Sequence, residues 1–223
     1  MRRPVKRSYQ SSLRAQQAEA TTRAIVDAAA ELFSEKGYGA VSIEAIAGAA
    51  GVSRATVFTS VGGKPALLKA AFRAAFGRAA GGPNAAMPLV ERPRSVEIRS
   101  RPTAHGYLDG YAGLATALFS HMARVYEAIR EGARSDPAVQ ELWVEVNAER
   151  RRGAETIVAD VKARARLSAG LDETAAADVV WVLNDPVHYD MLVRSRGWTD
   201  AQFQSWLARA LETTLLGRSS NSW

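Results

Sequence analysis

The sequence predicts an all-α protein, and three observations support this fold class. Apolar residues in the long segments recur at steps of three and four, which is the period of an amphipathic helix. No segment shows the clean alternation of polar and apolar residues that is typical of a half-buried strand. Alanine, leucine, glutamate and arginine, which are good helix formers, are frequent throughout. We therefore expect helices joined by short connections.

The first domain is expected to span residues 18–80 and to follow a disordered basic arm at residues 1–17, which are polar and lack periodicity. Its helices are bounded by residues that favour helix ends: serine at the N-cap, proline in the first turn and glycine at the C-terminal end. On these signals the four helices run over 19–36, from Ser42 to about Ala50, from Ser53 to about Ser60, and from Pro65 towards Phe76.

The second domain is expected to span residues 81–223. Four prolines and a Gly-Gly pair between residues 81 and 102 indicate loops with at most short helical pieces, so the domain boundary is placed there. The helices that follow are expected at 104–132 with a break near Ser120, 136–167, 172–195 with a kink at Pro186, and 199–216.

The bulk composition limits the possible functions. Of the 223 residues, 47% are hydrophobic and 23% are charged, as in ordinary soluble proteins. No apolar run approaches the roughly 18 residues that a membrane span needs, and the basic, polar N-terminus is unlike a signal peptide. Together with the absence of cysteine, these features predict a cytoplasmic protein with no membrane partner.

The net charge of +6 is concentrated at the N-terminal end. Residues 1–80 hold 12 Lys and Arg against 5 Asp and Glu, whereas residues 81–223 hold 17 against 18. A basic domain beside a neutral one indicates contact with a polyanion such as nucleic acid. The alternative is a solvated basic surface without a partner, and charge alone favours neither.

Residues 42–61 have a helix-turn-helix pattern: a short helix, a tight turn at Gly51-Val52 and a second short helix, which in proteins of this plan enters the DNA major groove. Val52, Val57 and Val61 must face the preceding helices to hold the unit together. The residues left for the outer face of the second helix are Arg54, Ala55, Thr56, Phe58, Thr59 and Ser60.

This outer face is small, hydroxylated and basic, which suits double-stranded DNA. Arginine bonds to guanine O6 and N7, hydroxyls reach phosphates, and alanine or an aromatic ring meets the thymine methyl group. The helix starts at Ser42 and Ser53 also point free backbone N–H groups outward, and such groups bind phosphate.

The order of residues over 21–72 adds a resemblance to this pattern. The segments that carry it are TRAIVDAA (22–29), LFSEKGY (32–38), IAGAAGVS (46–53) and KPALL (64–68). This order resembles the TetR family of transcriptional regulators. The resemblance implies a three-helix DNA reader and a fourth helix that links it to a ligand-binding, dimerising domain. It also implies that Arg54, Ala55, Thr56, Phe58 and Ser60 face DNA and that Lys64 contacts phosphate.

The chain departs from the family where Phe58 replaces the common tyrosine, so a phenolic hydrogen bond to DNA is missing. The basic arm is a candidate for supplying affinity instead, by lying in the adjacent minor groove. The alternative for the arm is plain disorder without a DNA contact. The basic residues of the arm are Arg2, Arg3, Lys6, Arg7 and Arg14.

Aromatic residues of the second domain predict a cavity for a small, largely apolar molecule, since such sites combine apolar walls with a few polar groups. The alternative for each residue is plain hydrophobic core. The candidates are Tyr107, Tyr111, Leu118, Phe119, Met122, Tyr126, Trp143, Asn147, Trp181, Asn184 and His188.

A homodimer is expected because helix-turn-helix proteins read two half-sites about one DNA turn apart. The family resemblance implies that the last two long helices pair with those of the partner; the alternative is that their apolar residues pack within one subunit. These residues are Val179, Val180, Leu183, Leu192, Phe203, Trp206, Leu207, Ala210, Leu211 and Leu215. A run of three arginines at 150–152, near several glutamates, is interpreted as a solvated helix face.

Three possible functions make different demands on the sequence. The favoured one is a sequence-specific repressor that binds a palindromic operator and is released by a small-molecule effector. A helical enzyme is disfavoured because the sequence has no metal-spaced His/Glu cluster, no cysteine and no phosphate-binding glycine loop, so no catalytic residue, metal or cofactor is expected. A nonspecific DNA-coating protein would differ in its salt dependence and its specificity ratio.

Overall fold

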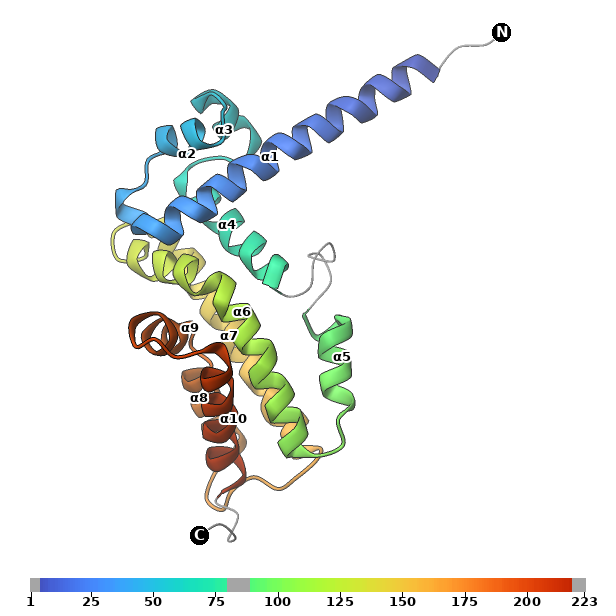
Figure 1. The fold of residues 1–223 in the computed structure, drawn as a ribbon, viewed down its shortest axis with the longest axis vertical. Helices are drawn as coiled ribbons and strands as arrows, with labels where there is room; N and C mark the ends of the chain where they lie inside the picture. Colours follow the sequence, from blue (N-terminus) through green and yellow to red (C-terminus); the bar gives the residue numbers. More distant parts are fainter. Residues whose placement is uncertain (1–4, 80–88, 218–223) are drawn as a thin grey trace.

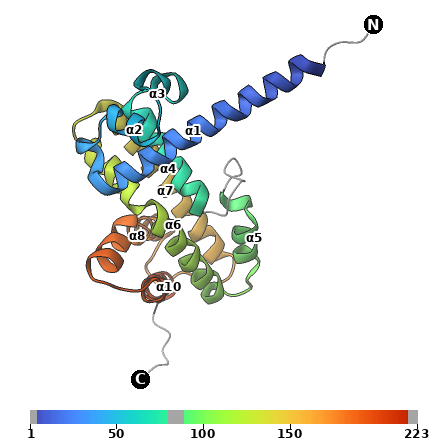
Figure 2. The same ribbon diagram turned by 45° about the horizontal axis from the view of Figure 1, so that its top comes forward.

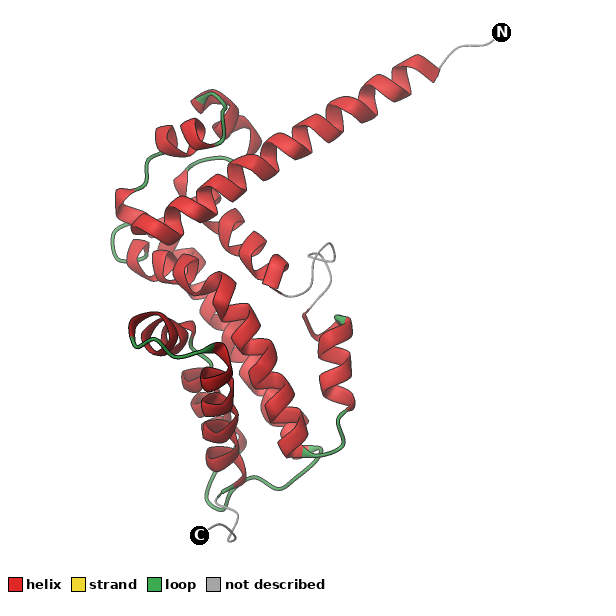
Figure 3. Cartoon of the chain, viewed as in Figure 1, coloured by secondary structure: helices red, strands yellow, loops and turns green. Residues whose placement is uncertain are grey.

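The computed structural model describes residues 5–79 and 89–217, and all regular elements within these ranges are helical (Figures 1 and 3). This confirms the predicted all-α class. The elements are α1 (Val5–Ala40), α2 (Ile43–Ala49), α3 (Arg54–Ser60), α4 (Lys64–Ala79), η1 (Leu89–Glu91), α5 (Pro93–Ser100), α6 (Ala104–Gly132), α7 (Pro137–Lys162), α8 (Glu173–Leu183), α9 (Pro186–Tyr189), the π-helical turn η2 (Asp190–Ser195) and α10 (Asp200–Leu216).

Side-chain caps begin most of these helices, as the sequence predicted. The Ser42 hydroxyl accepts the Ala45 N–H at the start of α2, and the Ser53 hydroxyl accepts the Thr56 N–H at the start of α3. Thr199 begins α10 with a reciprocal capping box. Each cap satisfies a backbone N–H that has no partner inside its helix.

Three boundaries differ from the prediction. The arm predicted as disordered over 1–17 is helical from Val5 onward, and residues 1–4 lie outside the described residues. No glycine or proline interrupts the sequence between Val5 and Gly37, so propensity alone permits one long helix. The break expected near Ser120 is absent, because its hydroxyl donates to the Ala117 carbonyl within an unbroken α6. Helix α7 ends at Lys162 rather than at residue 167.

Helix α6 is the central element of the fold. It packs against α1 and α4 at one end and against α5, α7, α9 and α10 along the rest of its length. Helix α4 packs against both α1 and α6, so the N-terminal helices and the second domain share one hydrophobic core. Figures 1 and 2 show the N-terminal part of α1 projecting away from this core. Residues 14–20 are all exposed, and the first buried residue among the described side chains of α1 is Ile25.

No helix within the described residues is both long and apolar enough to cross a membrane.

Candidate DNA-binding surface and ligand cavity

Helices α2 and α3 form a helix-turn-helix unit around a tight turn. Gly51 adopts φ +66°, a conformation that glycine tolerates best, and the Val52 N–H donates to the Ala47 carbonyl at 3.0 Å. Val57 is fully buried under α3, as predicted from the spacing of the valines. This burial fixes which side of α3 faces outward.

The outer face of α3 consists of the residues that the valine spacing indicated. Arg54, Ala55, Phe58 and Thr59 are exposed, whereas Thr56 and Ser60 are half-buried. Ser42 and Ser53, at the starts of α2 and α3, are exposed as well. Their role in DNA binding remains a prediction.

Two exposed side chains of this face, Arg54 and Thr59, contact other residues of the protein. The Arg54 guanidinium lies 2.9 Å from the Glu44 carboxylate and 5.5 Å from the Phe58 ring centroid. Both Arg54 and Glu44 are more than half exposed, so their ion pair is weak and easily exchanged for a base contact. The Thr59 hydroxyl donates to the Ala55 carbonyl, which leaves its oxygen able to accept.

The other predicted DNA contacts are Lys64 and the basic residues of the arm. Lys64 is half-buried, with its ammonium 4.2 Å from the Tyr38 ring centroid and 3.5 Å from the Gly39 carbonyl oxygen. Burial lowers the pKa of Lys64. A phosphate contact by this lysine therefore requires another rotamer. Arg2 and Arg3 lie outside the described residues, and although Lys6 and Arg7 lie in α1, their side chains are not described.

Tyr38, Lys64, Glu131 and Asp136 form a junction cluster between the N-terminal helices and the end of α6. The Glu131 carboxylate accepts the N–H groups of Tyr38 and Gly39 at 3.0 and 3.1 Å. The Tyr38 hydroxyl donates to Asp136 at 2.6 Å. Burial and this bond raise the pKa of Tyr38, and the same bond lowers the pKa of Asp136. The cluster ties the C-terminal end of α1, which leads into α2, to α6.

A cavity of about 710 Å³ lies beneath α4 and α5, against α6 and α7. Most of its wall is apolar, and α4 contributes Phe72 and Phe76 directly. Six of the residues predicted from the sequence line it: Tyr107, Tyr111, Leu118, Phe119, Met122 and Asn184.

Charged side chains also reach the cavity wall, and several of them form ion pairs there. Arg73 of α4 binds Glu149 and Glu145 of α7, each at 2.8 Å. The half-exposed Arg99 of α5 lies 3.0 Å from Asp160, a carboxylate that also accepts the Tyr107 hydroxyl at 3.1 Å. Burial and Asp160 together raise the pKa of Tyr107, so its hydroxyl stays protonated.

Arg150, a residue of the cavity wall, is the centre of a buried polar network. Its guanidinium donates to the Tyr126 hydroxyl at 3.0 Å and to the Trp181 carbonyl at 2.9 Å. It also lies 3.0 Å from the Asp185 carboxylate, and only 11% of its side chain is exposed. The network joins α6, α7 and the end of α8.

The N-terminal part of the chain matches a known family. Residues 25–71 match the family described as bacterial regulatory proteins, tetR family. These residues belong to the tetR family. They contain the helix-turn-helix unit and the first half of α4.

Solved structures of regulators share the fold over most of this chain. NalD, described as the secondary repressor of the MexAB-OprM multidrug efflux pump in Pseudomonas aeruginosa, is 23% identical, with a TM-score of 0.66 over 89% of this chain and 98% of that one. FadR from Bacillus subtilis in complex with stearoyl-CoA is 19% identical, with a TM-score of 0.66 over 88% and 99%. A regulator from Saccharomonospora viridis in complex with choline is 18% identical, with a TM-score of 0.65 over 88% and 98%. Among curated proteins, no match is found.

Five residues predicted to line a ligand site are not part of the wall of this cavity. Tyr126 is buried and packs on Trp143, and Asn147 and Trp181 bind Arg150. His188 packs on the ring of Trp206 and bonds to the Val182 carbonyl. The sequence did not reveal this, because helical spacing does not tell which neighbouring helix a face meets. The residues are Tyr126, Trp143, Asn147, Trp181 and His188.

The predicted dimer residues also need correction. Five of the ten are buried within the single chain and are not available to a partner, because the apolar face of α10 packs against α6 and α8. The other five are half-buried. The buried ones are Val180, Phe203, Leu207, Leu211 and Leu215, and the half-buried ones are Val179, Leu183, Leu192, Trp206 and Ala210.

Arg150 was missed as a site residue, and its interpretation as part of a solvated face is wrong. The run 150–152 turns through more than half a helix circumference, so its members cannot share one environment. Arg152 is exposed as expected, whereas Arg150 points inward. The acidic Asp185 and the tyrosines at helical spacing were the available signals for a buried partner.

Proposed function

We propose that this chain is a sequence-specific DNA-binding transcriptional regulator, a repressor that leaves its operator when a small molecule enters the cavity. Helix α4 is the observation that carries this proposal. It begins four residues after α3 ends and supplies Phe72, Arg73 and Phe76 to the cavity wall. Any occupant of the cavity therefore touches the helix that follows the recognition helix.

Ligand control requires that the molecule bind the DNA-bound and the released forms with different affinity. Three contacts between α4 and α7 supply such a difference: Lys69 lies 2.7 Å from Glu145, and Arg73 binds Glu145 and Glu149. A ligand that displaces Arg73 from these carboxylates shifts α4 relative to α7. The junction cluster then transmits movement of α6 to the end of α1 that leads into α2.

The active form is proposed to be a homodimer on a palindromic operator, since one small reader needs a second copy for useful specificity. Helices α8 and α10 are the proposed interface. Apolar side chains remain outward there, with Val182 52% exposed and Val179 and Leu183 half-buried. The basic start of α1 is proposed to contact the DNA backbone.

Selection of bound duplexes from a random DNA pool by the purified full-length protein tests the proposal. Recovery of a palindrome whose half-sites lie about one helical turn apart supports a dimeric operator reader. Binding that is sensitive to salt but yields no motif contradicts it and favours the nonspecific DNA-coating function.

Arg54→Ala is expected to relax sequence preference at one base-pair position of the selected site, with a cost of roughly 1–3 kcal/mol there. The reason is that Arg54 is the one arginine on the outer face of α3. Titrations of the selected duplex and of duplexes altered at each position measure this. Arg152→Ala, at an exposed arginine of α7, is the control and should change nothing. If Arg54→Ala also changes nothing, the proposed recognition face is misplaced.

A further inference from the structure

We infer that one end of the cavity is a head-group subsite, formed by Tyr111, Arg150 and Asn184, for an uncharged ligand that carries a hydrogen-bond donor beside an acceptor. This inference rests on the proposed function, since it names the chemical class of the molecule that the cavity takes.

The three residues come from different helices and meet at the cavity. Tyr111 lies on α6, Arg150 on α7, and Asn184 ends α8, and all three line the cavity. The Arg150 guanidinium donates to the Asn184 carbonyl at 3.2 Å. Burial raises the pKa of Tyr111, while Arg150 and the Asn184 side chain both act to lower it.

Two atoms of this subsite are buried without a hydrogen-bond partner among the described residues. They are the Nε of Arg150, a donor, and the Oδ1 of Asn184, an acceptor. Buried polar groups in native proteins are paired in the great majority of cases. A ligand head that both accepts and donates, such as a carboxamide or a hydroxyl, satisfies the two atoms together.

The charges at this end of the cavity favour an uncharged head. The cationic side chain of the subsite, Arg150, already lies 3.0 Å from Asp185. The wall carboxylates are held as well, Glu149 by Arg73 and Asp160 by Arg99. A charged ligand head therefore loses its hydration without gaining a counter-charge at the subsite.

The rest of the cavity suits an apolar body. Leu114, Leu118, Phe119 and Met122 continue along α6 from Tyr111, and Phe72 of α4 also reaches the wall. The expected ligand is thus an apolar chain or ring system with one neutral polar end, held between α6 and α4.

Three probes with the same ten-carbon chain test the head-group preference by calorimetric titration of the full-length protein without DNA: decanamide, decanoate and decyltrimethylammonium. Decanamide is expected to bind at least about tenfold more tightly than either charged probe. Decanoate or decyltrimethylammonium binding equally or more tightly overturns the inference, and so does the absence of binding by all three.

Variants that remove polar side-chain groups locate the preference. Tyr111→Phe and Asn184→Leu should each weaken decanamide binding about three- to tenfold, as expected for one lost hydrogen bond. Tyr107→Phe is the matched control on the same helix, because its hydroxyl is already bound to Asp160, and it should change decanamide affinity less than about twofold. Equal effects of Tyr107→Phe and Tyr111→Phe, or no effect of Tyr111→Phe and Asn184→Leu, overturn the subsite.

A DNA titration with and without decanamide separates this inference from the proposed function. If decanamide binds with the expected preference and leaves DNA affinity unchanged, the subsite stands and ligand-controlled release fails. If another molecule releases the DNA while decanamide shows no preference over the charged probes, release stands and the subsite fails.

Discussion

Gly37 permits the close approach between α1 and α6. Its φ of +74° is strained for other residues, and a Cβ atom there would lie 2.3 Å from the Glu131 carboxylate oxygen. Gly37→Ala is expected to lower the free energy of unfolding by about 1–3 kcal/mol, as measured by chemical denaturation. Gly48→Ala, with open space around its Cβ and a position inside α2, is the control and should be neutral or slightly stabilising. Equal losses from both would contradict this account.

Tyr38 links its neighbours through a charge-assisted bond whose strength depends on pH. Because the Tyr38 hydroxyl lowers the pKa of Asp136 in the folded protein, the ionised carboxylate stabilises the fold above the unfolded pKa of about 3.9, and this stabilisation is lost as the pH falls through the lower folded pKa. Tyr38→Phe should therefore cost about 1 kcal/mol at neutral pH and progressively less below about pH 4. Denaturation of both proteins across pH measures the difference. In an Asp136→Asn background the same substitution should show no such pH dependence.

Residues 14–20 of α1 are all exposed, and among the described side chains of this helix the first buried one is Ile25. Deletion of residues 1–17 should therefore shift the midpoint of thermal unfolding by less than about 2 °C, since little buried surface is lost. The same deletion is expected to weaken DNA binding most at low salt, because a basic segment acts through phosphates. A large fall in the unfolding midpoint would mean that this segment packs against the protein.

For the helices as elements, the starts could be predicted from the sequence, whereas the extent of two helices could not. Ser42, Ser53 and Thr199 cap helices where the sequence placed them, because capping is a local interaction. The length of α1 and the continuity of α6 at Ser120 were misjudged. A polar segment with good helix propensity carries no apolar stripe to reveal it, and a serine inside a helix can bond to its own turn.

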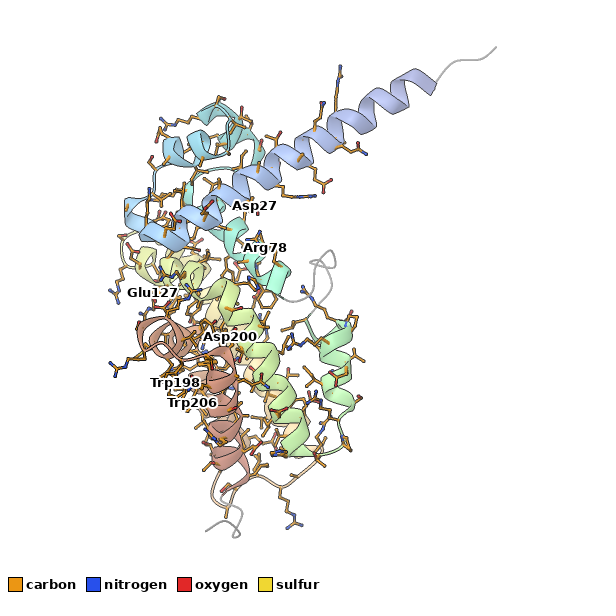
Figure 4. All side chains as sticks on the ribbon, viewed as in Figure 1. Asp27, Arg78, Glu127, Trp198, Asp200 and Trp206 are labelled. Carbon is orange, nitrogen blue, oxygen red and sulfur yellow. The ribbon has the colours of Figure 1, made fainter. Side chains whose placement is uncertain are left out.

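At the scale of the whole molecule, Arg73 connects three parts: it lies on α4, lines the cavity and forms ion pairs with α7. Its side chain is 40% exposed, so Arg73→Met should cost less than about 1 kcal/mol of stability. It should nevertheless reduce the change in DNA affinity that a cavity ligand causes, which DNA titrations with and without ligand measure. Arg78→Met is the control: Arg78 binds Asp27 of α1 at 2.6 Å, as labelled in Figure 4, and does not line the cavity. An undiminished ligand effect in Arg73→Met would remove these ion pairs from the proposed route.

The sequence predicted the outer face of α3 and about a quarter of the residues of the cavity wall, but not the buried polar network around Arg150. Valine spacing decides which way a short helix turns, because only one side of α3 can be buried. Arg150 and Asp185 are 35 positions apart in sequence, and nothing local indicates that they pair. For the same reason, the apolar residues of α10, such as Phe203 and Leu207, suited a partner subunit and the chain's own α6 equally well.

Tyr111 and Asn184 lie on other elements of the cavity wall than α4, which has a practical consequence for the design of ligand sensors. The groups proposed to choose the effector lie on α6 and at the end of α8, while the helix proposed to report occupancy reaches the cavity through Phe72, Arg73 and Phe76. A library randomised at positions 111 and 184 leaves every residue of α4 untouched. New input molecules can then be selected in such a library while the output, release of one fixed DNA site, stays as it is.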